Sequence, residues 1–121
     1  MGDIMKQVFA IGDIHGRFDL LTSLMTKIKN QANDGDKIVF LGDYIDRGPQ
    51  SKDVLDYLMN KDNFLGLELI TLMGNHERFM IDSYGPLSDY NYHSWMLNGG
   101  QETLDSFDWN DELVKSYIPW L

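Results

Sequence analysis

Apolar residues in this chain form short continuous runs, which alternate with longer stretches where apolar positions recur every three or four residues. The runs cover residues 7–11, 37–41 and 68–73. They predict strands of a parallel sheet, because such strands are nearly continuous in apolar residues when both faces of the sheet are covered. The stretches between them predict two helices, each with one apolar face.

The first predicted helix spans residues 18–30, and its buried face is formed by Leu20, Leu21, Leu24, Met25 and Ile28. The second helix begins after Pro49, with Ser51 as the expected N-cap. Its buried face is formed by Val54, Leu55, Leu58 and Met59. Strand, helix, strand, helix and strand therefore follow one another, and this order predicts the α/β class.

The chain after residue 77 has a weaker pattern. It predicts a short helix over residues 78–84, a turn-rich segment over 85–92 and a helical end over 110–121. We find no internal repeat and no linker composition, so residues 1–121 are interpreted as one domain.

The composition excludes several classes of protein. The chain has 121 residues, a net charge of −9 and no cysteine. The lack of cysteine excludes disulfides and thiolate metal sites and fits a cytoplasmic protein. The acidic excess disfavours nucleic acid as a partner. No run of eighteen apolar residues is present, which disfavours a membrane-spanning helix.

Three motifs follow the three predicted strands, with about thirty residues between neighbours. They are GDIHG at residues 12–16, GDYIDRG at 42–48 and GNHE at 74–77. Right-handed crossovers place the ends of parallel strands at one edge of a sheet, where ligands bind. The spacing therefore predicts that Asp13, Asp43 and Asn75 converge in space.

The residue types in these motifs suit a pair of divalent cations. Asp13 and His15 can reach one ion, and a carboxylate with an imidazole favours manganese, iron or zinc over calcium. Asp43 is the candidate bridging ligand, and Asn75 offers a neutral oxygen to the second ion. Two such cations would add four positive charges, so the acidic composition does not exclude an anionic substrate.

Other residues of the motifs suit phosphoester cleavage. His76 is the candidate general acid, with Asp46 as the carboxylate that orients it. Arg47 can bind phosphate oxygens, and Arg78 is either a further substrate contact or part of a surface ion pair. The alternatives are structural: Asp46 and Arg47 can form a simple salt bridge.

Four further side chains have structural interpretations. They are Glu77 as a structural carboxylate, His93 as a surface or core histidine, and Trp95 and Trp109 as core residues.

The three motifs resemble those of the calcineurin-like metallophosphoesterases, and Asp46-Arg47-Gly48 narrows the resemblance to the phosphoprotein phosphatase branch. Trp95, the NGG segment at 98–100 and Thr103 are similar to bacterial and phage members. The resemblance covers residues 7–107. It implies an α/β/β/α sandwich, of which this chain would supply the βαβαβ half.

The resemblance also implies roles for these residues. Asp13 and His15 would bind the first metal, Asp43 would bridge, and Asn75 would bind the second. His76 would be the proton donor, oriented by Asp46, and Arg47 would bind phosphate. The metals would be two manganese ions or an iron–zinc type pair.

The family takes further histidine ligands from a second half, in motifs like VHAG and GHT that this chain lacks. The chain is therefore expected to be a truncated N-terminal half. The opposing sheet would then be missing, and an exposed apolar sheet face would favour homo-oligomers.

The function implied is that of a metal-dependent phosphomonoester hydrolase of the serine/threonine protein phosphatase type, in which a metal-activated hydroxide attacks and His76 protonates the leaving group. Its substrate would be a phosphorylated protein or a small phosphoester. One alternative is a symmetrical dinucleoside-tetraphosphate hydrolase. Another is a catalytically incomplete fragment that acts as a binding or regulatory module.

Overall fold

A computed structural model describes residues 6–121 of the protein. The first five residues of the predicted domain lie outside the described residues. The chain begins with a β–α–β–α–β unit, formed by β1 (Val8–Ile11), α1 (Phe18–Gln31), β2 (Lys37–Phe40), α2 (Ser51–Met59) and β3 (Glu68–Thr71). A single 3₁₀ turn, Lys61–Phe64, lies between α2 and β3. The α/β class is therefore confirmed.

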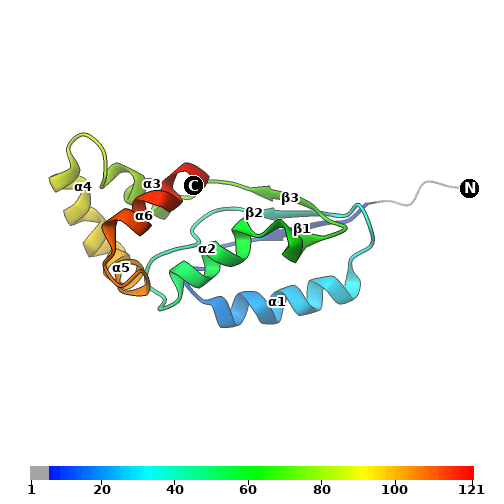
Figure 1. Ribbon diagram of the computed structural model, residues 1–121. Helices are drawn as coiled ribbons and strands as arrows, with labels where there is room; N and C mark the ends of the chain where they lie inside the picture. The colour runs from blue at the N-terminus through cyan, green and yellow to red at the C-terminus, as the bar shows by residue number, and fades with distance from the viewer. Residues whose placement is uncertain (1–5) are drawn as a thin grey trace, which may run out of the picture.

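The three strands form one parallel sheet in the order β1-β2-β3. Both α1 and α2 pack against the same face of this sheet (Figure 1). Ile38 and Phe40 on the central strand point toward the helices and are fully buried. The prediction of a sheet covered on both faces is wrong for residues 6–121, because the helices cover one face only.

The other face of the sheet is apolar and partly open to solvent. Alternate strand positions and their continuations point to this side, and Val8, Leu41 and Leu72 are 61%, 50% and 46% exposed. Val39 and Ile70 lie between them in the paired strands and are half-buried. We call these five residues the open sheet face.

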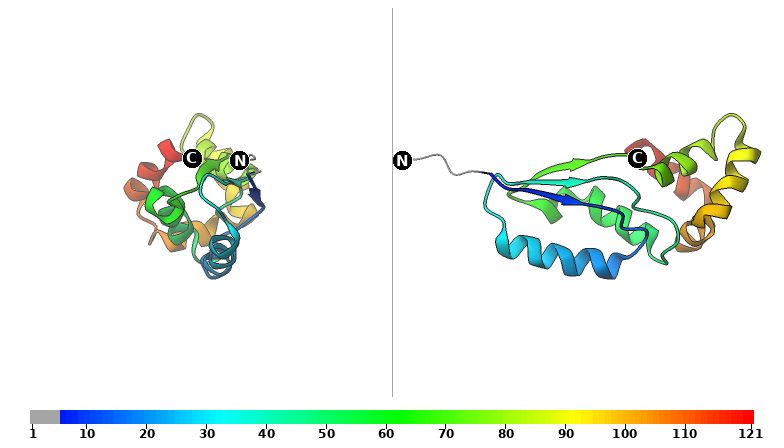
Figure 2. Two further views of the ribbon diagram at one scale, coloured as in Figure 1. Left: turned by 90° about the vertical axis from the view of Figure 1, so that its right-hand side faces the viewer. Right: turned by 180° about the vertical axis from the view of Figure 1, so that it is seen from behind.

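The rest of the chain is helical and gathers beyond the carboxyl ends of the strands (Figures 1 and 2). It comprises α3 (Asn75–Asp82), α4 (Ser88–Trp95), a wide turn over Met96–Gly100, α5 (Gln101–Ser106), α6 (Asp111–Tyr117) and a 3₁₀ turn at Ile118–Trp120. Helix α5 packs on α2, and α3 packs on α4. This helical layer lies where the strand-end loops converge. None of the helices within residues 6–121 is both long and apolar enough to cross a membrane.

Several local predictions are wrong. Leu20 and Leu24 are exposed and line an open hollow beside β1, and only Leu21, Met25 and Ile28 of α1 are buried in the core. Met59 ends α2 and is also exposed.

Other corrections concern helix ends. Ser51 is not an N-cap: Gln50 precedes α2, and the buried hydroxyl of Ser51 accepts a hydrogen bond from the backbone N–H of Asp46 instead. Residues 85–92 are not wholly turn, since α4 begins at Ser88. Trp109 is half-exposed rather than part of the core.

Candidate active site

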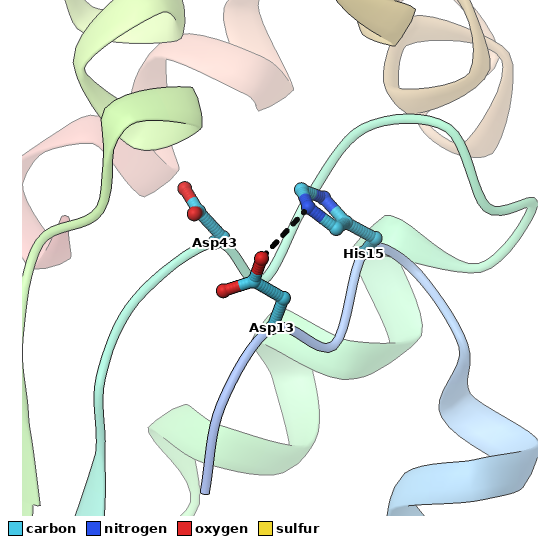
Figure 3. Close-up of side chains that lie close together, drawn as sticks. All are labelled: Asp13, His15 and Asp43. Carbon is cyan, nitrogen blue, oxygen red and sulfur yellow. Dashed lines mark ion pairs between the residues drawn. The ribbon is translucent and has the colours of Figure 1, made fainter.

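Two strand-end loops bring Asp13, His15 and Asp43 together. Asp13 and His15 follow β1, Asp43 follows β2, and the three side chains lie close together (Figure 3). One potential ligand atom from each lies within 4.8 Å of the others. The backbone N–H groups of Ile14 and His15 both donate to the carbonyl of Asp43 at 3.0 Å. The two loops are therefore joined directly, and the proximity of Asp13 to Asp43 that the spacing predicts is present.

The hydrogen bonding of His15 fixes which ring nitrogen is free. Its Nδ1 lies 2.8 Å from the carbonyl oxygen of Ile45. Because a carbonyl only accepts, Nδ1 carries a proton, and Nε2 is the ring nitrogen that can bind a metal ion. That Nε2 lies 3.6 Å from a carboxylate oxygen of Asp13. The imidazole thus has the orientation that a metal ligand needs.

Asp43 is held in an uncommon backbone conformation by hydrogen bonds from both sides. Its φ of 57° lies in the left-handed region, which is uncommon for non-glycine residues, although Asp adopts it more readily than most. Its N–H donates to the Glu77 carboxylate at 2.6 Å, and its own Oδ1 accepts from the N–H of His76 at 3.0 Å. The amino end of α3 therefore fixes the carboxylate that is predicted to bridge.

Glu77 is a buried structural carboxylate that connects the loop after β2 to the start of α3 by hydrogen bonds. Besides the N–H of Asp43, it accepts the N–H groups of Tyr44 and Gly74, each at 2.9 Å. Burial raises the pKa of Glu77, and the three backbone donors oppose that rise. Its structural interpretation from the sequence agrees with this geometry.

Asn75 is the first residue of α3, and its side chain is exposed beside His76. It lines a cavity of about 500 Å³ together with His76, Arg78 and Phe79. Arg78 is 66% exposed, and its Nε lies 3.2 Å from the Asp82 carboxylate. Arg78 therefore shares the surroundings of His76 but is already engaged in a surface ion pair.

His76 and Asp46 form a buried pair. The Nδ1 of His76 lies 2.8 Å from Oδ2 of Asp46, and Asp46 is fully buried. The imidazole of His76 also contacts that of His15 edge-on, with ring centroids 4.6 Å apart. Since Nδ1 faces the carboxylate, Nε2 is the atom of His76 that can exchange a proton with a substrate beside the Asp13–His15–Asp43 cluster.

Trp95 and Thr103, for which the sequence predicts no polar contact, also bind Asp46. The indole Nε1 of Trp95 lies 2.8 and 2.9 Å from the two carboxylate oxygens, and the hydroxyl of Thr103 donates to Oδ1 at 2.7 Å. Burial raises the pKa of Asp46, while the hydrogen bonds from Thr103, His76 and Trp95 oppose this rise. Trp95 is fully buried, as expected of a core residue, but it also donates.

Arg47 lies next to this pair but does not bind it. Its backbone N–H donates to the carbonyl of Gly99 at 3.0 Å, and its φ is 71°. Within residues 6–121 Asp46 makes its ion pair with His76, so the alternative of an Asp46–Arg47 salt bridge is wrong. The exposed side chain of Arg47 lines a cavity of about 600 Å³ that also contacts His15 and Arg17. This cavity opens directly beside the carboxylate–imidazole cluster.

The chemistry of the donors fits a divalent metal ion. Two carboxylates and a neutral imidazole suit manganese, iron or zinc. His93 lies exposed on α4, and within residues 6–121 the acidic and imidazole cluster consists of Asp13, His15 and Asp43 alone. One ion would therefore have three ligands from this chain, while Asp43 and Asn75 stay the predicted ligands of a second.

Comparison with known proteins identifies the family. Residues 6–119 match the model of the calcineurin-like phosphoesterases, and the chain belongs to this family of hydrolases, whose members use a pair of divalent metal ions. This membership agrees with the resemblance that the motifs carry.

Individual relatives differ in their substrates. The chain is 34% identical over 116 residues to serine/threonine-protein phosphatase 2 of Escherichia coli, which covers 96% of this chain and 47% of the relative. It is 40% identical over 73 residues to a symmetrical bis(5'-nucleosyl)-tetraphosphatase of Hamiltonella defensa, which covers 60% and 25%.

A crystal structure of a cold-active protein-tyrosine phosphatase from Shewanella superposes with a TM-score of 0.52 at 29% identity. This match covers 78% of the present chain and 32% of that one. The chain spans less than half the length of these relatives.

Proposed function

We propose that this chain carries the metal-binding and proton-donating part of a phosphatase that hydrolyses phosphomonoesters of serine and threonine in proteins. The observation that supports this most directly is the adjacency of two groups of side chains. A carboxylate–imidazole cluster within 4.8 Å lies beside a buried His76–Asp46 pair. Such an arrangement suits hydrolysis in which cations and an acid act on opposite sides of one phosphorus atom.

Each side chain has a distinct task in this proposal. Asp13, His15 and Asp43 would hold one cation, and Asp43 with Asn75 would contribute to a second. When bound, the cations supply Lewis acidity toward the phosphoryl oxygens and the attacking water. We favour manganese among the metals that this donor set suits. The cysteine-free composition fits action in a reducing cytoplasm.

The remaining groups handle the phosphate and the proton. Arg47 presents its guanidinium to the phosphoryl oxygens, which it can bind in a bidentate manner. His76 donates the Nε2 proton to the leaving oxygen, so that the departing alkoxide becomes an alcohol. Asp46 faces Nδ1 and stabilises the imidazolium form before that transfer. Acid catalysis of this type accelerates reactions by about 10²–10⁴-fold.

A specific feature supports a second candidate, the hydrolysis of dinucleoside polyphosphates. The cavity beside His15 is lined by two arginines, Arg17 and Arg47, in a chain with a net charge of −9. Arg17 donates Nε and Nη2 to the Asp19 carboxylate, an arrangement that orients its guanidinium. Asp19 lines the same cavity, so a second phosphoryl group would have to take the place of this carboxylate to bind both arginines. Relative rates on a phosphoserine peptide and on diadenosine tetraphosphate separate the two candidates.

The open sheet face suggests how the chain associates. It presents the apolar side chains of Val8, Val39, Leu41, Ile70 and Leu72, with the Lys37–Glu68 ion pair beside Val8. Surfaces of this kind are normally buried. We infer that copies of this chain self-associate through this face.

Replacement of His76 by asparagine tests the acid role. The expected result is a large loss of metal-dependent turnover for phenyl phosphate, with a poor leaving group, and a smaller loss for p-nitrophenyl phosphate, whose leaving group needs little protonation. His93→Asn is the matched control, since His93 is an exposed histidine of α4. Equal losses for both esters in His76→Asn would contradict the proposal.

A further inference from the structure

The Asp46 carboxylate accepts hydrogen bonds from two side chains besides His76. Oδ2 accepts from Nδ1 of His76, and Oδ1 accepts from the hydroxyl of Thr103. The indole N–H of Trp95 lies between the two oxygens, at 2.8 and 2.9 Å. Both oxygens of a fully buried carboxylate are therefore occupied by side-chain donors.

The donors come from a part of the chain far from the strand-end loops. Trp95 is 49 residues from Asp46 in sequence, and Thr103 is 57 residues away. Thr103 also accepts the backbone N–H of Asp46 at 2.9 Å, so that it binds the side chain and the main chain of one residue. The residue it holds has a φ of 76°, in the left-handed region that is uncommon for non-glycine residues.

The indole of Trp95 is itself placed by a close backbone approach. A Cβ added at Gly100 would lie 2.7 Å from three atoms of the indole ring. Only glycine allows the chain to pass so close to the ring. The segment 95–103 is thus shaped to direct one N–H and one hydroxyl at Asp46.

We propose that Trp95 and Thr103 are positioning residues for the general acid, because together they orient the Asp46 carboxylate toward Nδ1 of His76 and so leave Nε2 to serve the substrate. This inference rests on the proposed role of His76. A buried carboxylate is stable as an anion only when hydrogen bonds replace the lost water. Without these two donors Asp46 would keep one side-chain partner, His76.

The consequence for His76 follows from geometry. Without the indole of Trp95 and the hydroxyl of Thr103, the Asp46 carboxylate would be free to turn away from Nδ1 of His76. Nε2 would then be held less firmly toward the leaving oxygen. Proton donation would therefore weaken, although the metal cluster and Arg47 would be unaltered.

The first experiment is a crystal structure of a chain with both Trp95→Phe and Thr103→Val. We expect the Asp46 carboxylate to turn away from Nδ1 of His76, from which it lies 2.8 Å in the unaltered chain. Trp109→Phe is the matched control, because its indole donates to Asp105 at 2.7 Å on the surface. An unchanged Asp46–His76 contact in the double variant would overturn the proposal.

The second experiment uses single, conservative variants that keep the packing. In Trp95→Phe we expect kcat for phenyl phosphate to fall about tenfold relative to p-nitrophenyl phosphate, as part of the acid's contribution, while KM changes little. Thr103→Val should behave similarly, and Thr103→Ser, which keeps the hydroxyl, should restore the ratio. A loss that is equal for both esters would mean a structural role only.

The acid role of His76 and the positioning role of Trp95 and Thr103 are tested separately. If His76→Asn shows no dependence on the leaving group, the acid role of His76 is wrong. If His76→Asn shows that dependence and the Trp95 and Thr103 variants do not, only the positioning role is wrong.

Discussion

Replacement of Gly99 by alanine would disturb Arg47 without altering any charged group. Gly99 has a φ of 99°, and its carbonyl accepts the backbone N–H of Arg47. A Cβ at this position would lie 2.6 Å from Cγ, 2.7 Å from N and 3.2 Å from Cα of Arg47. Two of these three atoms belong to the backbone, so a rotamer change cannot relieve the overlap.

The expected cost has two parts. An L-residue in the left-handed region costs about 1–2 kcal/mol, and overlap in a well-packed site costs about 1–3 kcal/mol. The free energy of unfolding should therefore fall by about 2–5 kcal/mol, a large share of the 5–15 kcal/mol typical of domains. Displacement of Arg47 should also weaken phosphate binding.

Urea denaturation and calorimetric titration with orthophosphate in the presence of Mn²⁺ measure these two effects. Gly85→Ala is the matched control, because a Cβ there meets nothing closer than 3.8 Å. We expect that control to stay within about 1 kcal/mol of the unaltered chain. If Gly99→Ala were as stable as Gly85→Ala and bound phosphate equally well, the close approach to Arg47 would have no energetic importance.

Three other predictions concern separate parts of the molecule. Hydrogen bonds, first among them that from the N–H of Asn33, lower the pKa of Asp36. The stability that Asp36 provides is therefore present above about pH 3.9 and lost as the pH falls through its lower folded pKa. Asp36→Asn should flatten this acid limb in urea denaturation at successive pH values. Leu72→Lys on the open sheet face should lower the mass found by analytical ultracentrifugation, and an unchanged mass would exclude this face as the contact. Arg47→Gln should weaken orthophosphate binding in calorimetry more than Arg78→Gln does, and the reverse order would exchange their roles.

The convergence of the candidate metal ligands Asp13 and Asp43 could be predicted because it depends only on topology. Parallel strands joined by short crossovers must end at one edge, so Asp13 and Asp43 had to lie close together once the strands were recognised. The pairing of His76 with Asp46 follows from the same logic, since the β2 and β3 loops are neighbours. Here local pattern and global fold agree.

The contacts of Asp46 with Trp95 and Thr103 could not be predicted in this way. A Trp in an apolar segment indicates burial, but periodicity gives no information about where its N–H points. The prediction of Ser51 as an N-cap is wrong for a similar reason. Its hydroxyl accepts the backbone N–H of Asp46, and the pattern around a helix end does not indicate this partner. Leu20 and Leu24 line an open hollow beside β1, which helical spacing alone cannot reveal.

Titration of the chain with Mn²⁺, followed by electron paramagnetic resonance and calorimetry, tests the central claim most directly. We expect tight binding that Asp43→Asn or Asp13→Asn removes, whereas Asp89→Asn on α4 leaves it unchanged. Equal binding of manganese by the unaltered chain and by Asp43→Asn would contradict the assignment of these loops as a metal site.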